Sequence, residues 1–388
     1  MKYKYQLILL GDLGERSNNI EDLFFEKVAE LNLPKDAFVI IKFRDFAQNY
    51  TPSQPAFCLY FGNCNQSYKS VHLINRLIND ATPILPIFEN SFSEEIPDEL
   101  QNYNGQKYDN TKDSKIVNLA LESFGKLRQT RKVFVSYKRD DSTSVAIQLY
   151  EALEESNFDV FLDTHSIKQG ELFQEELWHR MTDCDVIIML NTTGFMTSRW
   201  CKEELAEASA KQIGILQLVW PNHQLENISH ICEPILLNQN DFIKGNYLCK
   251  NSSRLNDVIL KKIVSETESL RARNLAARQD NLITEFTNVA KKHGKSINLQ
   301  PERFLTEDLE GNKRRIFIPT IGIPQSINCN QSEELKQEIN EYDIESIHLI
   351  FDDIRIREKW LNHLEWLNKY LDIKTLKKQN FDTWLQNN

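Results

Sequence analysis

An aromatic side chain and two adjacent carboxylates lie close together in the stretch SRWCKEELAEA, residues Ser198–Ala208. If this stretch is helical, Trp200 and Glu204 share one face, because they are four residues apart. A pair with this spacing is usually a packing tryptophan beside a solvated glutamate. The same spacing also suits a site in which an indole ring and a carboxylate hold a substrate together. The pair alone leaves both interpretations open.

Cysteine and histidine residues give weaker indications of chemistry. Cys201 has no histidine near it in sequence, so a small buried thiol is a simpler interpretation than a nucleophile. His165 and His179 are not accompanied by a cluster of carboxylates, and we expect no metal site there. The seven cysteines are scattered without a CxxC pair, which indicates neither a zinc site nor disulfides.

The bulk composition is that of a globular protein of two or three domains, with 388 residues of which 41% are hydrophobic and 26% charged. A formal net charge of −10 argues against binding to bulk nucleic acid or to anionic membranes. The first apolar run is too short for a signal peptide, and no stretch approaches the ~20 apolar residues of a membrane span. We therefore expect a cytoplasmic protein.

Strand and helix patterns alternate around the opening stretch. Apolar runs predict strands, and apolar residues at helical spacing predict the helices between them. This order, β-α-β-α-β-α-β, is typical of a flavodoxin-like parallel sheet. The strands are expected at Val133–Tyr137, Phe158–Leu162, Val186–Leu190, Ile213–Trp220 and Glu233–Leu237, with helices at Ser142–Ser156, around Phe173–Met181 and at Ser198–Gln212.

Similar alternation on both sides predicts two smaller α/β domains. The N-terminal part has strand patterns from Tyr5 to Phe88, and the C-terminal part has them at Arg315–Ile321 and Ser346–Phe351. A charged helical stretch without glycine or proline closes the middle domain and bridges to the last one. We divide the chain into an N-terminal domain (1–130), a middle domain (131–251), a helical segment (252–293) and a C-terminal domain (294–388).

Three stretches of the middle domain resemble the Toll/interleukin receptor (TIR) family, specifically its bacterial members. They follow the family's order and spacing: a first box, a second strand with the long loop after it, and the helix with the catalytic glutamate. The resemblance covers roughly Arg131–Asn222, about a quarter of the chain. The stretches are VFVSYKRDDS (Val133–Ser142), DVFLDTHSIKQGELF (Asp159–Phe173) and SRWCKEEL (Ser198–Leu205).

The resemblance implies cleavage of the nicotinamide–ribose bond of NAD, which would make the protein an NAD+ nucleosidase. NAD is then the substrate, and neither a cofactor nor a metal is needed. Glu204 occupies the position of the catalytic glutamate, which Glu203 does not match because only Glu204 is followed by leucine. The substrate-binding positions that the resemblance implies are Trp200, Ser136, Lys138, Arg139 and Asp163.

The chemistry of that reaction suits these residue types. Loss of nicotinamide leaves positive charge on the ribose, and a fixed carboxylate such as Glu204 stabilises this charge in the transition state. An indole face such as that of Trp200 attracts a cationic pyridinium ring by ~0.5–2 kcal/mol. Lys138 and Arg139 suit a pyrophosphate or the adenine ribose. Each residue also has an ordinary interpretation, as a packing, capping or solvated side chain.

The resemblance also implies activation by self-assembly, with NAD and further copies of the chain as partners, in bacterial defence of the antiphage type. One alternative is an adaptor that binds other TIR domains without catalysis. Another is an enzyme that makes a cyclic ADP-ribose signal. The N-terminal domain has no SxWCxxEL helix, and we interpret it as a sensor or a degenerate TIR-like domain. Its stretch Gly62–Ser70 is closer to a β–α turn than to a phosphate loop.

Overall fold

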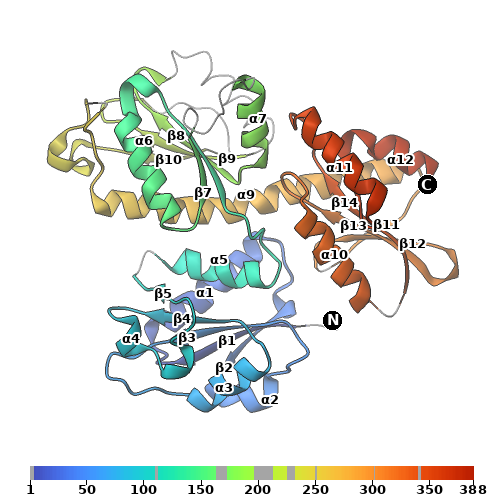
Figure 1. Cartoon of the computed structure of the whole chain (residues 1–388), viewed down its shortest axis with the longest axis horizontal. Helices are drawn as coiled ribbons and strands as arrows, with labels where there is room; N and C mark the ends of the chain where they lie inside the picture. Colours follow the sequence, from blue (N-terminus) through green and yellow to red (C-terminus); the bar gives the residue numbers. More distant parts are fainter. Residues whose placement is uncertain are drawn as a thin grey trace. The chain divides into compact units, whose positions relative to one another are not determined.

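The computed structural model describes residues 4–109, 112–162, 173–195, 213–224, 232–249, 251–300, 302–339 and 342–388. The chain divides into two compact units, Met1–Gln129 and Thr130–Asn388. Three five-stranded sheets organise them, one in the first unit and two in the second (Figure 1). The α/β class predicted from the sequence is confirmed.

The first sheet has five parallel strands in the order β2-β1-β3-β4-β5. Residues in the central strands are buried on both faces, as expected for a parallel sheet that is covered by helices on each side. The strands are β1 (Tyr5–Gly11), β2 (Phe38–Lys42), β3 (Ala56–Phe61), β4 (Ile84–Phe88) and β5 (Gln106–Lys107), and the α-helices are α1 (Glu15–Glu30), α2 (Phe46–Asn49), α3 (Val71–Asn79), α4 (Phe92–Glu95) and α5 (Asp113–Ser123).

Asp12 organises the carboxyl edge of the first sheet. Its carboxylate accepts hydrogen bonds from Asn63 Nδ2 at 2.9 Å and from Lys69 Nζ at 2.7 Å. Both partners belong to the segment that connects β3 to α3, which is the Gly62–Ser70 stretch. Lys69 is thus held by a carboxylate of its own unit, which gives this connection a structural role.

The second sheet is also parallel, in the order β10-β9-β8-β6-β7. Counted from its first strand, this order is 2-1-3-4-5, the flavodoxin-like order that the sequence predicts, and the first sheet shares it. The strands are β6 (Lys132–Ser136), β7 (Asp159–Leu162), β8 (Val186–Asn191), β9 (Gly214–Val219) and β10 (Cys232–Leu236), and the helices are α6 (Arg139–Glu154), α7 (Phe173–Asp183) and α9 (Asp257–Lys292).

Alternation along the strands of the second sheet separates two apolar clusters. Val133 and Val135 of β6 pack with residues of α6 and α9 on one face. Phe134, the residue between them, packs on the other face with Met181 of α7 and Ile187 of β8. Every described residue of β8 and β9 is buried, so these two strands form the centre of the core.

Helix α9 belongs to two hydrophobic cores. It is a single helix of 36 residues, about 54 Å long, and the side chain of Asn256 caps its first turn. Residues in its first half, such as Ile263, pack against the second sheet, and residues in its second half, such as Phe286, pack against the third (Figure 1). Although α9 is long, neither it nor another helix in the described ranges is apolar enough to cross a membrane.

The third sheet is mixed, in the order β11-β12-β13-β14-β15. Strands β11 to β13 pair antiparallel, whereas β13 to β15 pair parallel. The carboxyl ends of β13, β14 and β15 therefore meet at one edge. The strands are β11 (Ile297–Leu299), β12 (Leu305–Asp308), β13 (Lys313–Pro319), β14 (Asp343–Phe351) and β15 (Lys374–Lys377), and the helices are α10 (Ser326–Glu338), α11 (Glu358–Tyr370), the 3₁₀ turn η8 (Lys378–Asn380) and α12 (Phe381–Asn387).

Gly214 allows α9 to approach β9. A Cβ atom at this position would lie 1.7 Å from Nδ2 of Asn274, which is itself buried. We expect Gly214→Ala to lower the free energy of unfolding of the second unit by about 1–3 kcal/mol, because the helix must shift outward. Urea unfolding followed by tryptophan fluorescence measures this. All six tryptophans, Trp178, Trp200, Trp220, Trp360, Trp366 and Trp384, belong to the second unit.

The control for this prediction is the double variant Gly214→Ala/Asn274→Ala. Truncation of Asn274 removes the atoms that the new methyl group would meet. The double variant should therefore lose less stability than the sum of the two single variants. Strict additivity would contradict the proposed steric cause.

His348 gives the third sheet a dependence on pH. Burial, together with the nearby charges of Arg315 and Lys374, lowers the pKa of this histidine to about 4. The unfolded chain, with a histidine pKa near 6.5, then binds more protons than the folded chain between these values. The contribution of His348 to the free energy of unfolding is therefore fully present above pH 6.5. It should fall by about 3 kcal/mol as the pH drops toward 4.

The variant His348→Phe isolates this contribution. The ring of His348 stacks on Phe317 at 5.6 Å, so an aromatic replacement keeps the packing and removes the titrating group. Between pH 7.5 and 4.5 the variant should lose about 2.5 kcal/mol less stability than the wild type. Equal pH dependence of the two proteins in urea unfolding would show that His348 is not the group responsible.

Candidate functional site

Three of the site residues predicted from the sequence lie at the carboxyl edge of the second sheet. Ser136 is the last residue of β6 and is buried. Lys138 is the N-cap residue of α6, and Arg139 is the exposed first residue of that helix. Open α/β sheets bind ligands at this edge, so the chain directions place these side chains where a substrate would be held.

Lys138 is part of a small polar cluster at this edge. Its Nζ lies 3.7 Å from Oδ2 of Asp141, one turn along α6. The same Oδ2 accepts a hydrogen bond from Thr192 Oγ1 at 2.8 Å. Thr192 directly follows β8, which pairs with β6, so the cluster joins the ends of two neighbouring strands.

Gly194 brings the segment after β8 close to Lys138. A Cβ atom at this glycine would lie 2.3 Å from Lys138 Nζ and 2.6 Å from Asp141 Oδ2. A side chain at position 194 would therefore displace the ammonium group. Glycine at this position fixes where the cation sits, which makes the cluster dependent on a residue that does no chemistry itself.

The cluster leaves the Lys138 ammonium able to bind an anion. At 3.7 Å its contact with Asp141 is an ion pair without a hydrogen bond, and its side chain is 31% exposed. The N-terminal end of α6, which carries partial positive charge, lies beside it. This part of the edge is thus suited to a phosphate or pyrophosphate group.

Asn191, at the end of β8, is a second polar group at this edge. It is fully buried, and its Nδ2 donates to Gln217 Oε1 and to the carbonyl oxygen of Gln224, both at 3.1 Å. Within the part of the chain that the structure describes, its Oδ1 has no donor. A buried acceptor without a donor is an unusual feature, and here it lies at the end of a central strand.

Four residues at this edge are not among the site residues predicted from the sequence: Asp141, Thr192, Gly194 and Asn191. The signals were present in the sequence as the second aspartate of KRDDS and as the NTTG that follows the apolar run VIIML. Polar residues immediately after a buried strand of a parallel sheet mark the binding edge. The strand prediction was therefore sufficient to place Asn191 and Thr192 at this edge.

The remaining predicted residues, Glu204, Trp200 and Asp163, lie outside the described residues. The same holds for the neighbouring residues Glu203 and Cys201. Their roles in the site stay predictions from the sequence.

His179 has a structural role in α7. It is buried, its Nδ1 accepts from the backbone N–H of Arg357 at 3.4 Å, and its ring stacks on Trp360 at 5.6 Å. A search of the described residues finds no group of three or more His, Cys, Asp or Glu side chains that is placed to hold a metal ion. These contacts account for His179 as a link between α7 and the segment before α11.

Comparison with known proteins identifies the family of the second sheet. A search of curated proteins finds no match. One matching solved structure is tagatose-6-phosphate ketose/aldose isomerase from Escherichia coli, at 14% identity over 71% of this chain and 81% of that chain. Its TM-score is 0.19, too low to support an inference. A sequence model described as TIR domain matches residues 133–237, which run from β6 to the end of β10. Residues 133–237 of this chain therefore form a TIR domain.

Proposed function

We propose that this chain is an NAD glycohydrolase that cleaves the nicotinamide–ribose bond in its TIR domain. The observation that carries the proposal is the TIR match, which spans both the Glu204 stretch and the polar edge around Lys138. TIR domains include enzymes of this kind and adaptors. A glutamate at the catalytic position supports the enzyme, since adaptors often lack it.

In the proposed reaction the ribose acquires positive charge as nicotinamide leaves, and Glu204 stabilises that charge. Nicotinamide is already a good leaving group, so no general acid is required. Trp200 offers an aromatic face to the pyridinium ring. The other half of the substrate would lie at the end of β6, where Lys138 and Arg139, at the start of α6, are suited to bind its pyrophosphate.

Self-assembly of the chain is part of the proposal. TIR enzymes generally become active when loops of one copy complete the site of another, so we infer a homo-oligomer with low activity before assembly. In a bacterial cell such an enzyme would serve antiphage-type defence by consuming NAD. The flanking sheets would then supply the sensor or the assembly contacts.

The first test is the release of nicotinamide from NAD by the purified full chain at increasing protein concentration, with the products separated by chromatography. We expect release whose rate per chain rises with concentration. The co-product distinguishes hydrolysis, which gives ADP-ribose, from formation of a cyclic ADP-ribose. The absence of release at every concentration, also after enforced dimerisation, would favour the adaptor.

A further inference from the structure

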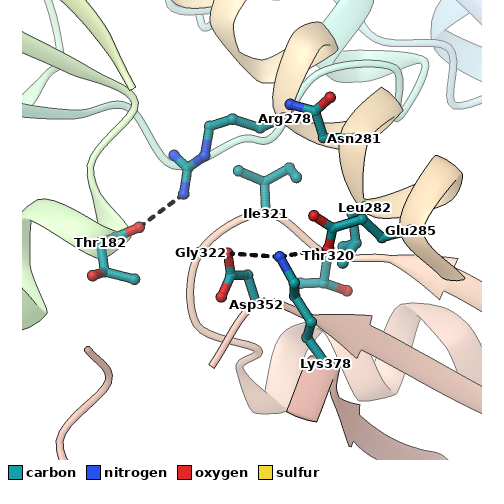
Figure 2. Close-up of a pocket in the computed structure, with 10 residues that line it drawn as sticks. All are labelled: Thr182, Arg278, Asn281, Leu282, Glu285, Thr320, Ile321, Gly322, Asp352 and Lys378. Atoms are coloured by element: carbon teal, nitrogen blue, oxygen red, sulfur yellow. Dashed lines mark hydrogen bonds and ion pairs between the residues drawn. The ribbon is translucent and has the colours of Figure 1, made fainter. Parts of the chain in front are cut away.

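A cavity lies where helix α9 crosses the carboxyl edge of the third sheet (Figure 2). Its volume of about 150 Å³ has room for a ligand of roughly six to ten non-hydrogen atoms. One wall is α9, and the opposite wall is formed by residues that directly follow β13, β14 and β15. Ligands of open α/β sheets bind at such an edge.

Two cations and two carboxylates line this cavity. The Nζ atom of Lys378 lies between Glu285 Oε2, at 2.5 Å, and Asp352 Oδ2, at 3.9 Å (Figure 2). The exposed fractions of these three side chains are 29% for Lys378, 45% for Glu285 and 36% for Asp352. Arg278 supplies the second cation. The charged groups are therefore balanced. The side chains of Lys378, Glu285 and Asp352 are partly exposed, whereas the Glu285 Oε2 atom that faces Lys378 is buried and accepts no hydrogen bond among the described residues.

Donors are also available elsewhere in the lining of the cavity. Asn281 of α9 lines the cavity, as do Ile321 and Gly322 of the loop after β13. Among the described residues, no hydrogen bond satisfies the Asn281 amide or the backbone N–H groups of Ile321 and Gly322. Such donors, next to a guanidinium, suit a carboxylate.

We propose that this cavity binds a small zwitterion of the free amino acid class. The ligand's ammonium group is held by Glu285 and Asp352, and its carboxylate is held by Asn281, the loop after β13 and the Arg278 side. A ligand with a net charge fits less well. The charges of the lining already balance one another, so the charge of such a ligand would stay uncompensated. The cavity volume matches an amino acid and is too small for a dinucleotide.

The position of the cavity connects its occupant to the TIR domain. Arg278 donates hydrogen bonds to the carbonyl oxygens of Thr182 and Cys184, at and just after the end of α7. Ile323, next to the cavity loop, donates its backbone N–H to Asp183 Oδ1 at 3.0 Å. An occupant that orders the loop and Arg278 therefore stabilises the C-terminal end of α7. This helix directly follows residues 163–172, the loop stretch of the TIR resemblance.

Binding is tested on the full chain by thermal unfolding with each of the twenty free amino acids at about 10 mM, followed by calorimetric titration of any that respond. At least one should raise Tm, by roughly 5–10 °C when it is present at 100 times its Kd. Hydrogen exchange with that amino acid should then slow at the amides of residues 178–183 and 320–323. Inorganic phosphate and glycerol serve as probes for anionic and neutral polyhydroxyl ligands.

The variants Glu285→Gln and Asp352→Asn each remove one carboxylate charge from the proposed ammonium site, and each should weaken binding at least 10-fold. Glu266→Gln is the matched control on α9, outside the cavity, and should bind as the wild type does. The proposal is overturned if no amino acid raises Tm, if phosphate or glycerol alone does so, or if both cavity variants bind normally. Because no readout involves NAD, failure here and failure of the proposed enzymatic activity are distinguishable.

Discussion

Replacement of Glu204 by glutamine should lower the rate of nicotinamide release on the order of 10³-fold, comparable to removal of one preorganised electrostatic group from an active site. Glutamine keeps the size of the side chain and its hydrogen-bonding oxygen but loses the negative charge. If the carboxylate stabilises the oxocarbenium-like transition state, the loss should appear in kcat, with a small change in KM. Steady-state assays with NAD as the varied substrate measure both.

Glu203→Gln is the matched control, because it makes the same chemical change at the adjacent position. It should retain activity close to that of the wild type. A comparable loss in Glu203→Gln with retention in Glu204→Gln would transfer the catalytic role to Glu203. Equal activity in wild type and Glu204→Gln would remove Glu204 from the mechanism.

Truncation of Arg271 should cost about 3–5 kcal/mol of stability in the second unit. The side chains of Arg271 and Asp185 are both fully buried, and Arg271 Nε donates to Asp185 Oδ2 at 3.0 Å. Arg271→Ala leaves the carboxylate inside the protein without its main counter-charge, close to where α9 packs against the start of β8. The large cost arises from this unpaired charge. Urea unfolding followed by tryptophan fluorescence measures the loss.

Two comparisons separate this cause from simple loss of packing. Arg273→Ala removes an exposed arginine of the same helix that lies 3.4 Å from Glu233, and it should cost no more than about 1 kcal/mol. The double variant Arg271→Met/Asp185→Leu removes both charges and should recover most of the stability that Arg271→Ala loses. A cost below about 1 kcal/mol for Arg271→Ala, or no recovery in the double variant, would contradict the argument.

Strands were predicted successfully where both of their faces are buried, because such strands appear in the sequence as continuous apolar runs. Apolar runs such as Ala56–Phe61 are recognisable as strands because both faces of a parallel sheet are covered. The sequence was less informative about the third sheet, where β11, β12 and β15 are short and partly exposed. Helix α10 (Ser326–Glu338) carries few apolar residues in its early turns, so helical periodicity gives little indication of where it begins.

The positions of three candidate site residues were predictable from the family motifs and the strand ends, whereas the contacts at this edge were not. The family resemblance implies Ser136 and Lys138 as binding residues, and chain direction explains their place at this edge, since β6 ends there. The partnership of Asp141 with Thr192 depends on the pairing of β6 with β8, and a single sequence does not reveal pairing. The cavity beside α9 could not be predicted from the sequence either, because its charged residues are separated by up to about a hundred positions along the chain.

The shared helix α9 also sets the rotation of the third sheet relative to the TIR domain about the helix axis. Each residue of an α-helix advances the chain by about 1.5 Å and turns it by about 100°. Insertion of one residue between Leu275 and Leu282 would thus rotate the third sheet about the helix axis by more than a quarter turn relative to the TIR domain. A flexible linker absorbs such a change in length without consequence. In this chain the length of α9 sets the rotation of one sheet relative to the other. Substitutions in α9 should therefore be tolerated more easily than insertions or deletions.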